Sequence, residues 1–296
     1  MSNHRLPSQA RAAIVLVAPA LIVITLFYLL PVAGAVVLSV TDFDIYSIGD
    51  VSNTRFVGVA NYAKLLQSPL FWKALTNTLY FTFVALPLTI LVALVAALLL
   101  NSKATRFKAL FRTIYFAPVV TTIVAVSIVF RYIYHGRVGL LNQFLLVFGV
   151  TPIDWLGEAR WAMPAIILLA VWKNFGYSAV IFLAGLQNVD ASLYEAARID
   201  GAGPVRQFWH VTIPELMPTF VFVGVITGIG FLQVFAEPYV MTPEGGPLNS
   251  TLSIVMLMYR EGFRWWNMGY AAAVAFVLFA LVMIATALQR VVRSAR

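Results

Sequence analysis

The chain has 296 residues, of which 61% are hydrophobic and only 11% are charged, and its mean hydropathy is +0.88. Soluble globular domains are about half apolar and about a quarter charged, so this composition excludes an ordinary soluble protein and indicates a membrane protein. The net charge of +8 comes from basic residues scattered among loops, a pattern that does not indicate nucleic-acid binding. The chain has no cysteine, which excludes disulfides and thiolate metal sites.

Apolar segments long enough to cross a bilayer recur along the chain, since a spanning helix needs about 17–25 residues. Six spans are predicted, over residues 14–40, 74–100, 114–130, 163–186, 216–236 and 268–288. Pro31 is predicted to kink the first span. An amphipathic segment over residues 61–72 is predicted to lie at the membrane interface.

Six spans place both termini on one side of the membrane. Lys and Arg are somewhat more numerous on that side, notably in the short loop from Lys103 to Arg112 and in the C-terminal tail. The positive-inside rule therefore predicts cytoplasmic termini. We expect one all-α, polytopic transmembrane domain over residues 14–288, with cytoplasmic segments at 1–13 and 289–296.

A polar interruption follows the fourth span. Ser192 and Glu195 have the spacing of a capping box and predict the start of a helix. Gly201 is predicted to adopt a left-handed conformation at its C-terminus. Pro204 is predicted to begin a second helix, which Pro214 ends. Because helices of about two turns are unstable alone in water, we expect another surface to dock on this segment.

Polar residues also lie within the fourth and fifth predicted spans. Lys173 falls near mid-membrane, where a charge costs about 2.5–3.5 kcal/mol on insertion scales. Tyr177 lies one turn further along the same face, and Gln233 and Glu237 have the same spacing on the next span. Such groups either bond between helices or line a polar pathway, and their association with aromatic rings favours a pathway for a sugar. The predicted pathway residues are Lys173, Asn174, Tyr177, Phe231, Gln233 and Glu237.

Several motifs that would indicate an enzyme are missing from the sequence. There is no GxxxxGK[ST] phosphate loop, so any ATP hydrolysis must come from a partner. His4, His135 and His210 are widely separated, and we predict neither a metal site nor a cofactor. A membrane enzyme is disfavoured because the sequence shows no paired-carboxylate, Ser-His or metal-ligand constellation at useful spacing. An ion-coupled secondary transporter remains an alternative, although inverted repeats are not apparent.

The polar segment resembles the EAA loop of binding-protein-dependent ABC importer permeases. The resemblance rests on Glu195-Ala196-Ala197, Asp200-Gly201-Ala202, Phe208 and Ile213-Pro214. It implies that the loop, at about residues 187–213, is cytoplasmic and binds an ATP-hydrolysing subunit. The residues implied in that contact are Glu195, Ala196, Ala197, Asp200, Gly201, Ala202 and Gly203.

A second set of residues is similar to the carbohydrate-uptake branch of these permeases, of the maltose and glycerol-phosphate type. This set comprises Phe56-Val57-Gly58, Asn61-Tyr62, Tyr239-Val240-Met241-Thr242, Gly245-Gly246-Pro247, Ser250-Thr251, Tyr259 and Phe263. The resemblance implies a type I importer fold in the inner membrane, with a solute site on the spans that flank the 187–213 loop. It also implies partners, namely an ABC ATPase dimer, a second homologous permease and an extracellular or periplasmic solute-binding protein.

The solute implied by the resemblance is a disaccharide, an oligosaccharide or a glycerol phosphate. Lys173 is unusual beside a neutral sugar and leaves an anionic group on the solute open. A permease of the same family for a non-sugar solute is a further alternative.

Overall fold

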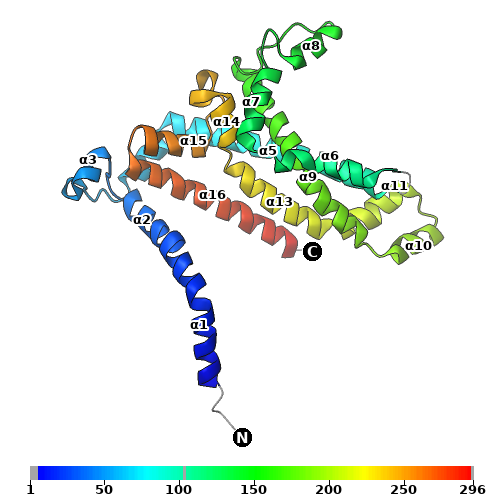
Figure 1. Cartoon of the computed structure of the whole chain (residues 1–296), viewed down its shortest axis with the longest axis horizontal. Coiled ribbons are helices and arrows are strands. Elements are labelled where there is room, and N and C mark those ends of the chain that lie inside the picture. The colour runs from blue at the N-terminus through cyan, green and yellow to red at the C-terminus, as the bar shows by residue number, and fades with distance from the viewer. Residues whose placement is uncertain (1–5, 103–104, 295–296) are drawn as a thin grey trace. The chain divides into compact units, whose positions relative to one another are not determined.

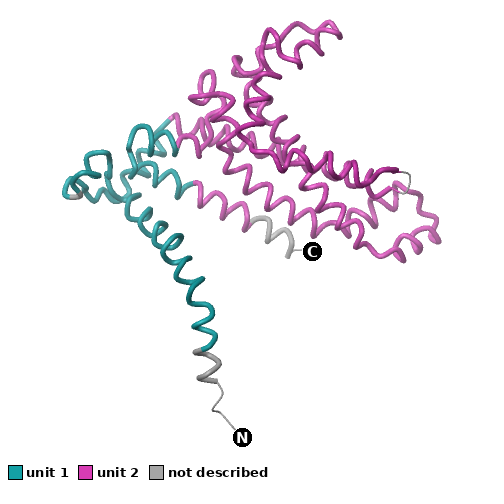
Figure 2. Tube along the Cα trace, in the orientation of Figure 1, with its two compact units in different colours: residues 1–68, 258–277 teal, residues 69–257, 278–296 magenta. Residues whose placement is uncertain are grey.

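The computed structural model describes residues 6–102 and 105–294 (Figure 1). The regular structure of these residues is helical, apart from an isolated antiparallel bridge between Thr41 and Phe56. The chain divides into two compact units (Figure 2). Unit 1 comprises residues 1–68 and 258–277, and unit 2 comprises residues 69–257 and 278–296.

Parts of three predicted features lie outside the described residues. Residues 1–5 belong to the predicted N-terminal segment, and residues 295–296 belong to the predicted C-terminal segment. Lys103, which begins the most basic predicted loop, also lies outside the described residues.

The first span of unit 1 is a helical run that contains a π-helical turn. It consists of α1 (Leu6–Ile24), the turn Thr25–Leu29 and α2 (Leu30–Ser39). Pro31 is the second residue of α2, two positions after the turn ends. Proline lacks an amide donor and its ring crowds the carbonyl four residues earlier, which a wider π turn accommodates. The disturbance predicted at Pro31 takes this form.

The loop after α2 is held by the side chains at the start of α4. α3 (Ile45–Gly49) precedes α4 (Ala60–Gln67). Asn61 Nδ2 donates to the carbonyls of Ser39 at 3.0 Å and Thr41 at 2.7 Å, and the Tyr62 hydroxyl donates to Ser39 Oγ at 2.9 Å. The amphipathic segment predicted over 61–72 is divided between α4, which ends at Gln67, and the start of α5 (Pro69–Asn101).

The core of unit 2 forms around α9. α9 packs against α5, α6 and α13, while α14 packs against α7. Apolar side chains such as Phe81, Ile166, Leu94 and Phe182 are buried between these helices. The elements after α4 are α5 (Pro69–Asn101), α6 (Lys108–Val120), α7 (Ile123–Ile133), α8 (Leu140–Val147), α9 (Ala159–Gln187), α10 (Ala191–Ile199), α11 (Pro204–Gln207), α12 (Ile213–Glu215), α13 (Met217–Leu232), α14 (Ala236–Met241), α15 (Ile254–Tyr259) and α16 (Met268–Ser294).

Five of the six predicted spans correspond to helices that are long and apolar enough to cross a membrane. These are Ala12–Ser39, Pro69–Asn101, Ala159–Gln187, Met217–Met241 and Met268–Ala287. The polytopic all-α fold predicted from the sequence is thus confirmed.

The third predicted span, over 114–130, is not a straight helix. α6 and α7 meet at 98° across Thr121 and Thr122, whose backbones are extended. The Thr121 hydroxyl and amide both donate to the carbonyl of Pro118, at 2.6 and 3.3 Å, and so close the end of α6. Apolar composition predicted this segment's place in the membrane but not the turn within it.

The fifth predicted span is also broken. α13 ends at Leu232 and α14 begins at Ala236, so the prediction that Gln233 and Glu237 lie one turn apart on a continuous helix is wrong. The Ser253 hydroxyl donates to the carbonyl of Val234 at 2.7 Å. Irregular backbone at membrane depth needs such partners, because lipid offers none.

Candidate functional site

A cavity of about 430 Å³ lies between α9 and the α13–α14 segment. Both polar and aromatic side chains line it. The lining residues are Asn174, Tyr177, Ser178, Ile226, Thr227, Gly230, Phe231, Gln233, Val234, Phe235, Ala236 and Glu237. Gln233 and Phe235 lie in the break after α13 (Met217–Leu232), and Glu237 lies in the first turn of α14 (Ala236–Met241). The volume falls within the range of about 300–1,000 Å³ that is typical of small-molecule sites.

Five of the six predicted pathway residues line this cavity. Tyr177 and Gln233 are exposed, whereas Asn174 and Glu237 are half-buried. The Asn174 amide donates to the carbonyl of Ala170 at 2.8 Å, which uses one of its donors. The structure therefore brings these groups together, and their role in binding a solute stays a prediction.

Phe231 contributes less open ring surface than the sequence suggested. Its side chain is buried, and its ring packs edge-on against Phe81 at 5.4 Å between centroids. Phe235, which stacks on Tyr239 at 5.0 Å, is the more accessible aromatic residue of the cavity. The i, i+4 spacing alone did not distinguish the two rings.

Sequence reasoning missed two hydroxyl groups in the cavity, those of Ser178 and Thr227. Within the described residues, the buried Ser178 Oγ has no hydrogen-bond partner. Ser178 lies four residues after Asn174, so helical spacing offered a signal that would have found it.

Lys173, the sixth predicted residue, is not among the residues that line the cavity. Its ammonium donates instead to backbone carbonyls at the end of α6, at 2.7 Å to Pro118 and 2.8 Å to Thr121. The mid-membrane charge is thus paired with backbone oxygens, as expected for a cation in a span.

The 187–213 loop connects the two helices that line the cavity. Asp190, not Ser192, caps α10, because the Asp190 carboxylate accepts from the Ser192 amide at 2.9 Å. The predicted capping box is therefore wrong: the helix starts two residues earlier, where an acidic side chain precedes it. Hydrogen bonds from the Ser192 amide and hydroxyl hold the pKa of Asp190 below its ordinary value.

The end of α10 confirms the left-handed conformation predicted for Gly201, whose φ is +75°. The Ala202 amide donates to the carbonyl of Ala197 at 2.8 Å, and the Gly201 amide to that of Arg198 at 3.0 Å. This paired pattern is the Schellman motif, which satisfies the last carbonyls of a helix. Pro204 begins α11, as predicted.

Pro214 does not end the second helix. A π turn, Phe208–Thr212, precedes it, and the helical run continues through α12 to Glu215. The wider turn makes room for the proline ring where a regular α-helix would have clashed. A hydrogen bond of 2.9 Å between Tyr194 Oη and Thr212 Oγ1 joins the two arms of the loop.

The surface of the 187–213 loop is open and partly apolar. Every residue of α10 and α11 is exposed or half-buried, and Ile199 is 86% exposed, Val205 72% and Trp209 60%. Glu195 and Arg198 form an exposed ion pair at 3.9 Å. The other predicted contact residues, Ala196, Ala197, Asp200, Ala202 and Gly203, lie on the same loop.

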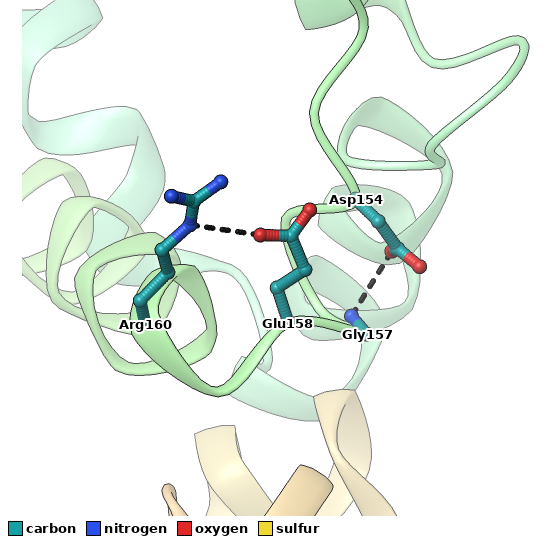
Figure 3. Close-up of polar contacts among 4 residues, drawn as sticks. All are labelled: Asp154, Gly157, Glu158 and Arg160. Carbon is teal, nitrogen blue, oxygen red and sulfur yellow. Dashed lines mark hydrogen bonds and ion pairs between the residues drawn. The ribbon is translucent and has the colours of Figure 1, made fainter.

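Another cavity, of about 600 Å³, lies beside α7 and the following loop. Three basic side chains, Arg131, His135 and Arg137, line it together with Asp154. In the adjoining turn, Asp154 accepts from the Gly157 amide at 3.0 Å, and Arg160 Nε donates to Glu158 Oε2 at 2.8 Å (Figure 3).

Together these features define a polytopic α-helical membrane protein in which an exposed helical loop joins the two helices that line an internal polar cavity. The chain belongs to the family of binding-protein-dependent transport system inner membrane components, which it matches over residues 71–295. The family predicted from the 187–213 loop is therefore confirmed, as is the role of a permease.

Similar proteins cover nearly the whole chain. The lactose transport system permease protein LacF of Rhizobium radiobacter is 39% identical over 277 residues, which are 92% of this chain and 91% of LacF. The arabinooligosaccharides transport system permease protein AraP of Bacillus subtilis is 37% identical over 278 residues, covering 94% and 87%. The crystal structure of a bacterial alginate ABC transporter, in complex with an alginate pentasaccharide-bound periplasmic protein, has the same fold. Its matching chain is 22% identical, with a TM-score of 0.79 over 95% of this chain and 93% of that one.

Proposed function

We propose that this chain is the permease subunit of an ATP-driven importer and passes a carbohydrate through the cavity between α9 and α13–α14. The observation that carries this proposal is the gathering of Asn174, Tyr177, Gln233 and Glu237 with accessible Phe235 in one cavity. Amide, hydroxyl and carboxylate groups bond sugar hydroxyls, and an aromatic face packs on sugar C–H surfaces. The relatives named for lactose and arabinooligosaccharides support a disaccharide or oligosaccharide.

The 187–213 loop is proposed to bind an ABC ATPase dimer on the cytoplasmic side. Its exposed apolar side chains, Ile199, Val205 and Trp209, are the kind of surface that a partner covers. Because α9 leads into the loop and α13 follows it, a displacement of the loop moves both sides of the cavity. Closure of the ATPases would thereby switch the access of the cavity from one side of the membrane to the other, through packed helices.

The remaining partners follow from the same orientation. With cytoplasmic termini, the segment 131–161 and its basic cavity face outward, where a solute-binding protein docks. A second, homologous permease completes the pathway, as the family's importers imply. ATP binding and hydrolysis belong to the partner subunits, since the sequence carries no phosphate loop.

Uptake by the reconstituted complex tests the carbohydrate assignment. The complex with its ATPase, second permease and binding protein is placed in liposomes and supplied with disaccharides, oligosaccharides, glycerol phosphate and an amino acid. ATP-dependent uptake of a sugar, reduced in Gln233→Ala and retained in the exposed control Gln67→Ala, is expected. Uptake of the amino acid alone would exclude a carbohydrate permease.

Copurification separates this proposal from an ion-coupled carrier. An importer permease is expected to copurify with an ATPase and to lose uptake when ATP is withheld. Purification of the chain alone, with uptake that follows an ion gradient, would contradict the proposal.

A further inference from the structure

The break between α6 and α7 leaves backbone carbonyls without helical partners inside the membrane. The last carbonyls of a helix lack amide partners from a following turn. Lipid cannot bond them, so irregular backbone at this depth persists only where protein or water satisfies it. α6 ends at Val120, and the chain turns by 98° before α7 begins at Ile123.

The Lys173 ammonium adds a donor at the end of α6, where the Pro118 carbonyl already accepts from Thr121. Its Nζ donates to the carbonyl of Pro118 at 2.7 Å and to that of Thr121 at 2.8 Å, with Val119 O at 3.4 Å. A cation at the C-terminus of a helix also interacts favourably with the helix dipole. One side chain of α9 thus caps a helix more than fifty residues earlier in the chain.

α6 and α9 approach each other closely beside this cap. At Gly176, three residues after Lys173, the Tyr115 carbonyl comes so near that a Cβ there would overlap it. The Tyr115 ring packs edge-on against Phe175 at 5.7 Å. The end of α6 is therefore held to α9 by both backbone packing and the ammonium.

The cap lies directly behind the cavity. Asn174, the next residue, lines the cavity, and so does Glu237 on α14. α9 continues from Lys173 to the 187–213 loop without a break. A movement of α9 that begins at the loop must therefore pass through the cap.

We infer that Lys173 is a positioning residue that holds the end of α6 to the cavity helix α9, so that α6 and its bend move with α9, and that it does not bind the solute. Its ammonium is committed to backbone oxygens, which leaves the cavity without this cation and favours a neutral solute over an anionic one. The expected preference for a neutral solute rests on the proposed function, whereas the expected effect of Lys173 on the bend between α6 and α7 does not.

The bend itself is measured by spin labels. The chain has no cysteine, so labels attach only where cysteines are introduced. Leu110 on α6 and Val129 on α7 are 57% and 55% exposed and accept labels without entering the core. In the assembled complex in lipid nanodiscs, Lys173→Met is expected to broaden and lengthen the distance between labels, because the Thr121 carbonyl loses the ammonium and the Pro118 carbonyl keeps only its bonds from Thr121. Lys173→Arg is expected to restore a single narrow distance.

Lys73→Met is the matched control, since it removes the same charge from an exposed position in unit 2. It is expected to leave the label distance unchanged. An unchanged distance in Lys173→Met would overturn the inference. If Lys173→Met does not reach the membrane, Lys173→Gln, a weaker donor, takes its place and is expected to broaden the distance more than Lys173→Arg does.

Uptake kinetics separate positioning from solute binding. Lys173→Met is expected to lower the maximal rate about tenfold or more while KM stays within about threefold, the pattern of a group that does not contact the solute. The loss should be the same for neutral and anionic solutes, and Lys173→Arg should recover much of it. A raised KM at unchanged maximal rate, or a selective loss of anionic solutes, would assign Lys173 to solute binding instead. If the wild-type complex carries no sugar, the proposed function fails while the label distances still decide the inference.

Discussion

Replacement of Gly176 by alanine tests the close packing of α6 on α9. A Cβ at this position would lie 1.8 Å from the Tyr115 carbonyl oxygen, a backbone atom that cannot rotate away. Because Cβ atoms essentially never approach other heavy atoms within 3.0 Å, the helices would have to separate by at least about 1.2 Å. Overpacking of this kind costs about 1–3 kcal/mol, and separation would also stretch the Lys173 contacts.

Thermal unfolding of the purified permease in detergent measures this cost. At about 2–4 °C per kcal/mol for chains of comparable length, Gly176→Ala should lower Tm by several degrees. Gly224→Ala is the matched control, because the space around a Cβ on that α13 glycine is open to 4 Å. Alanine there should leave Tm unchanged or raise it slightly, since it favours a helix over glycine by about 0.5–1 kcal/mol. Equal Tm values for Gly176→Ala and the wild type would refute the packing.

Three further predictions concern single residues. Gly201→Val places a side chain in the left-handed conformation, which costs about 1–2 kcal/mol. Gly201→Asn tolerates that conformation but also places a side chain in the open space beside the loop. Loss of ATP-coupled uptake in both variants would indicate that a partner docks there, because only Gly201→Val strains the backbone. Asn77→Ala should cost about 1–3 kcal/mol in thermal unfolding, because buried Asn77 donates to the carbonyls of Asn249 and Leu252 at 2.7 and 3.0 Å; an unchanged Tm would refute that bridge. Because the pKa of Asp190 is lowered, its cap is present at neutral pH and is lost as pH falls from the ordinary carboxyl pKa through the lowered one. The protection of the α10 amides, measured as exchange relative to the intrinsic rate at each pH, should fall in that window and should not change there in Asp190→Ala.

Local signals in the sequence were sufficient to predict much of the backbone of the 187–213 loop. Gly201 and Pro204 were placed correctly because their backbone preferences act within one turn. The capping box failed because two candidate caps compete two residues apart, and Asp190 took the position predicted for Ser192. Such competition depends on where the preceding helix ends, which sequence spacing does not fix.

The candidate cavity shows which features helical periodicity did not predict. Gln233 and Glu237 were expected to meet on one face of a continuous helix, and they line the same cavity although the helix breaks between them. Both residues line the cavity as predicted, but the break between them, where the Val234 carbonyl accepts from the Ser253 hydroxyl, left no signal in the periodicity. The expectation that Phe231 offers an open ring failed because Phe81 covers it.

By itself, the sequence determined that the chain spans a membrane, where most spans lie, and where the turn of the 187–213 loop falls, because hydrophobic length and turn chemistry act over neighbouring residues. Only the tertiary structure decided that the third span turns by 98°. It also decided that Lys173 donates to backbone carbonyls of that span and does not line the cavity. A helix break within lipid is stable only when its unpaired oxygens find a donor. Here that donor comes from a helix far along the chain, and its position is set by packing.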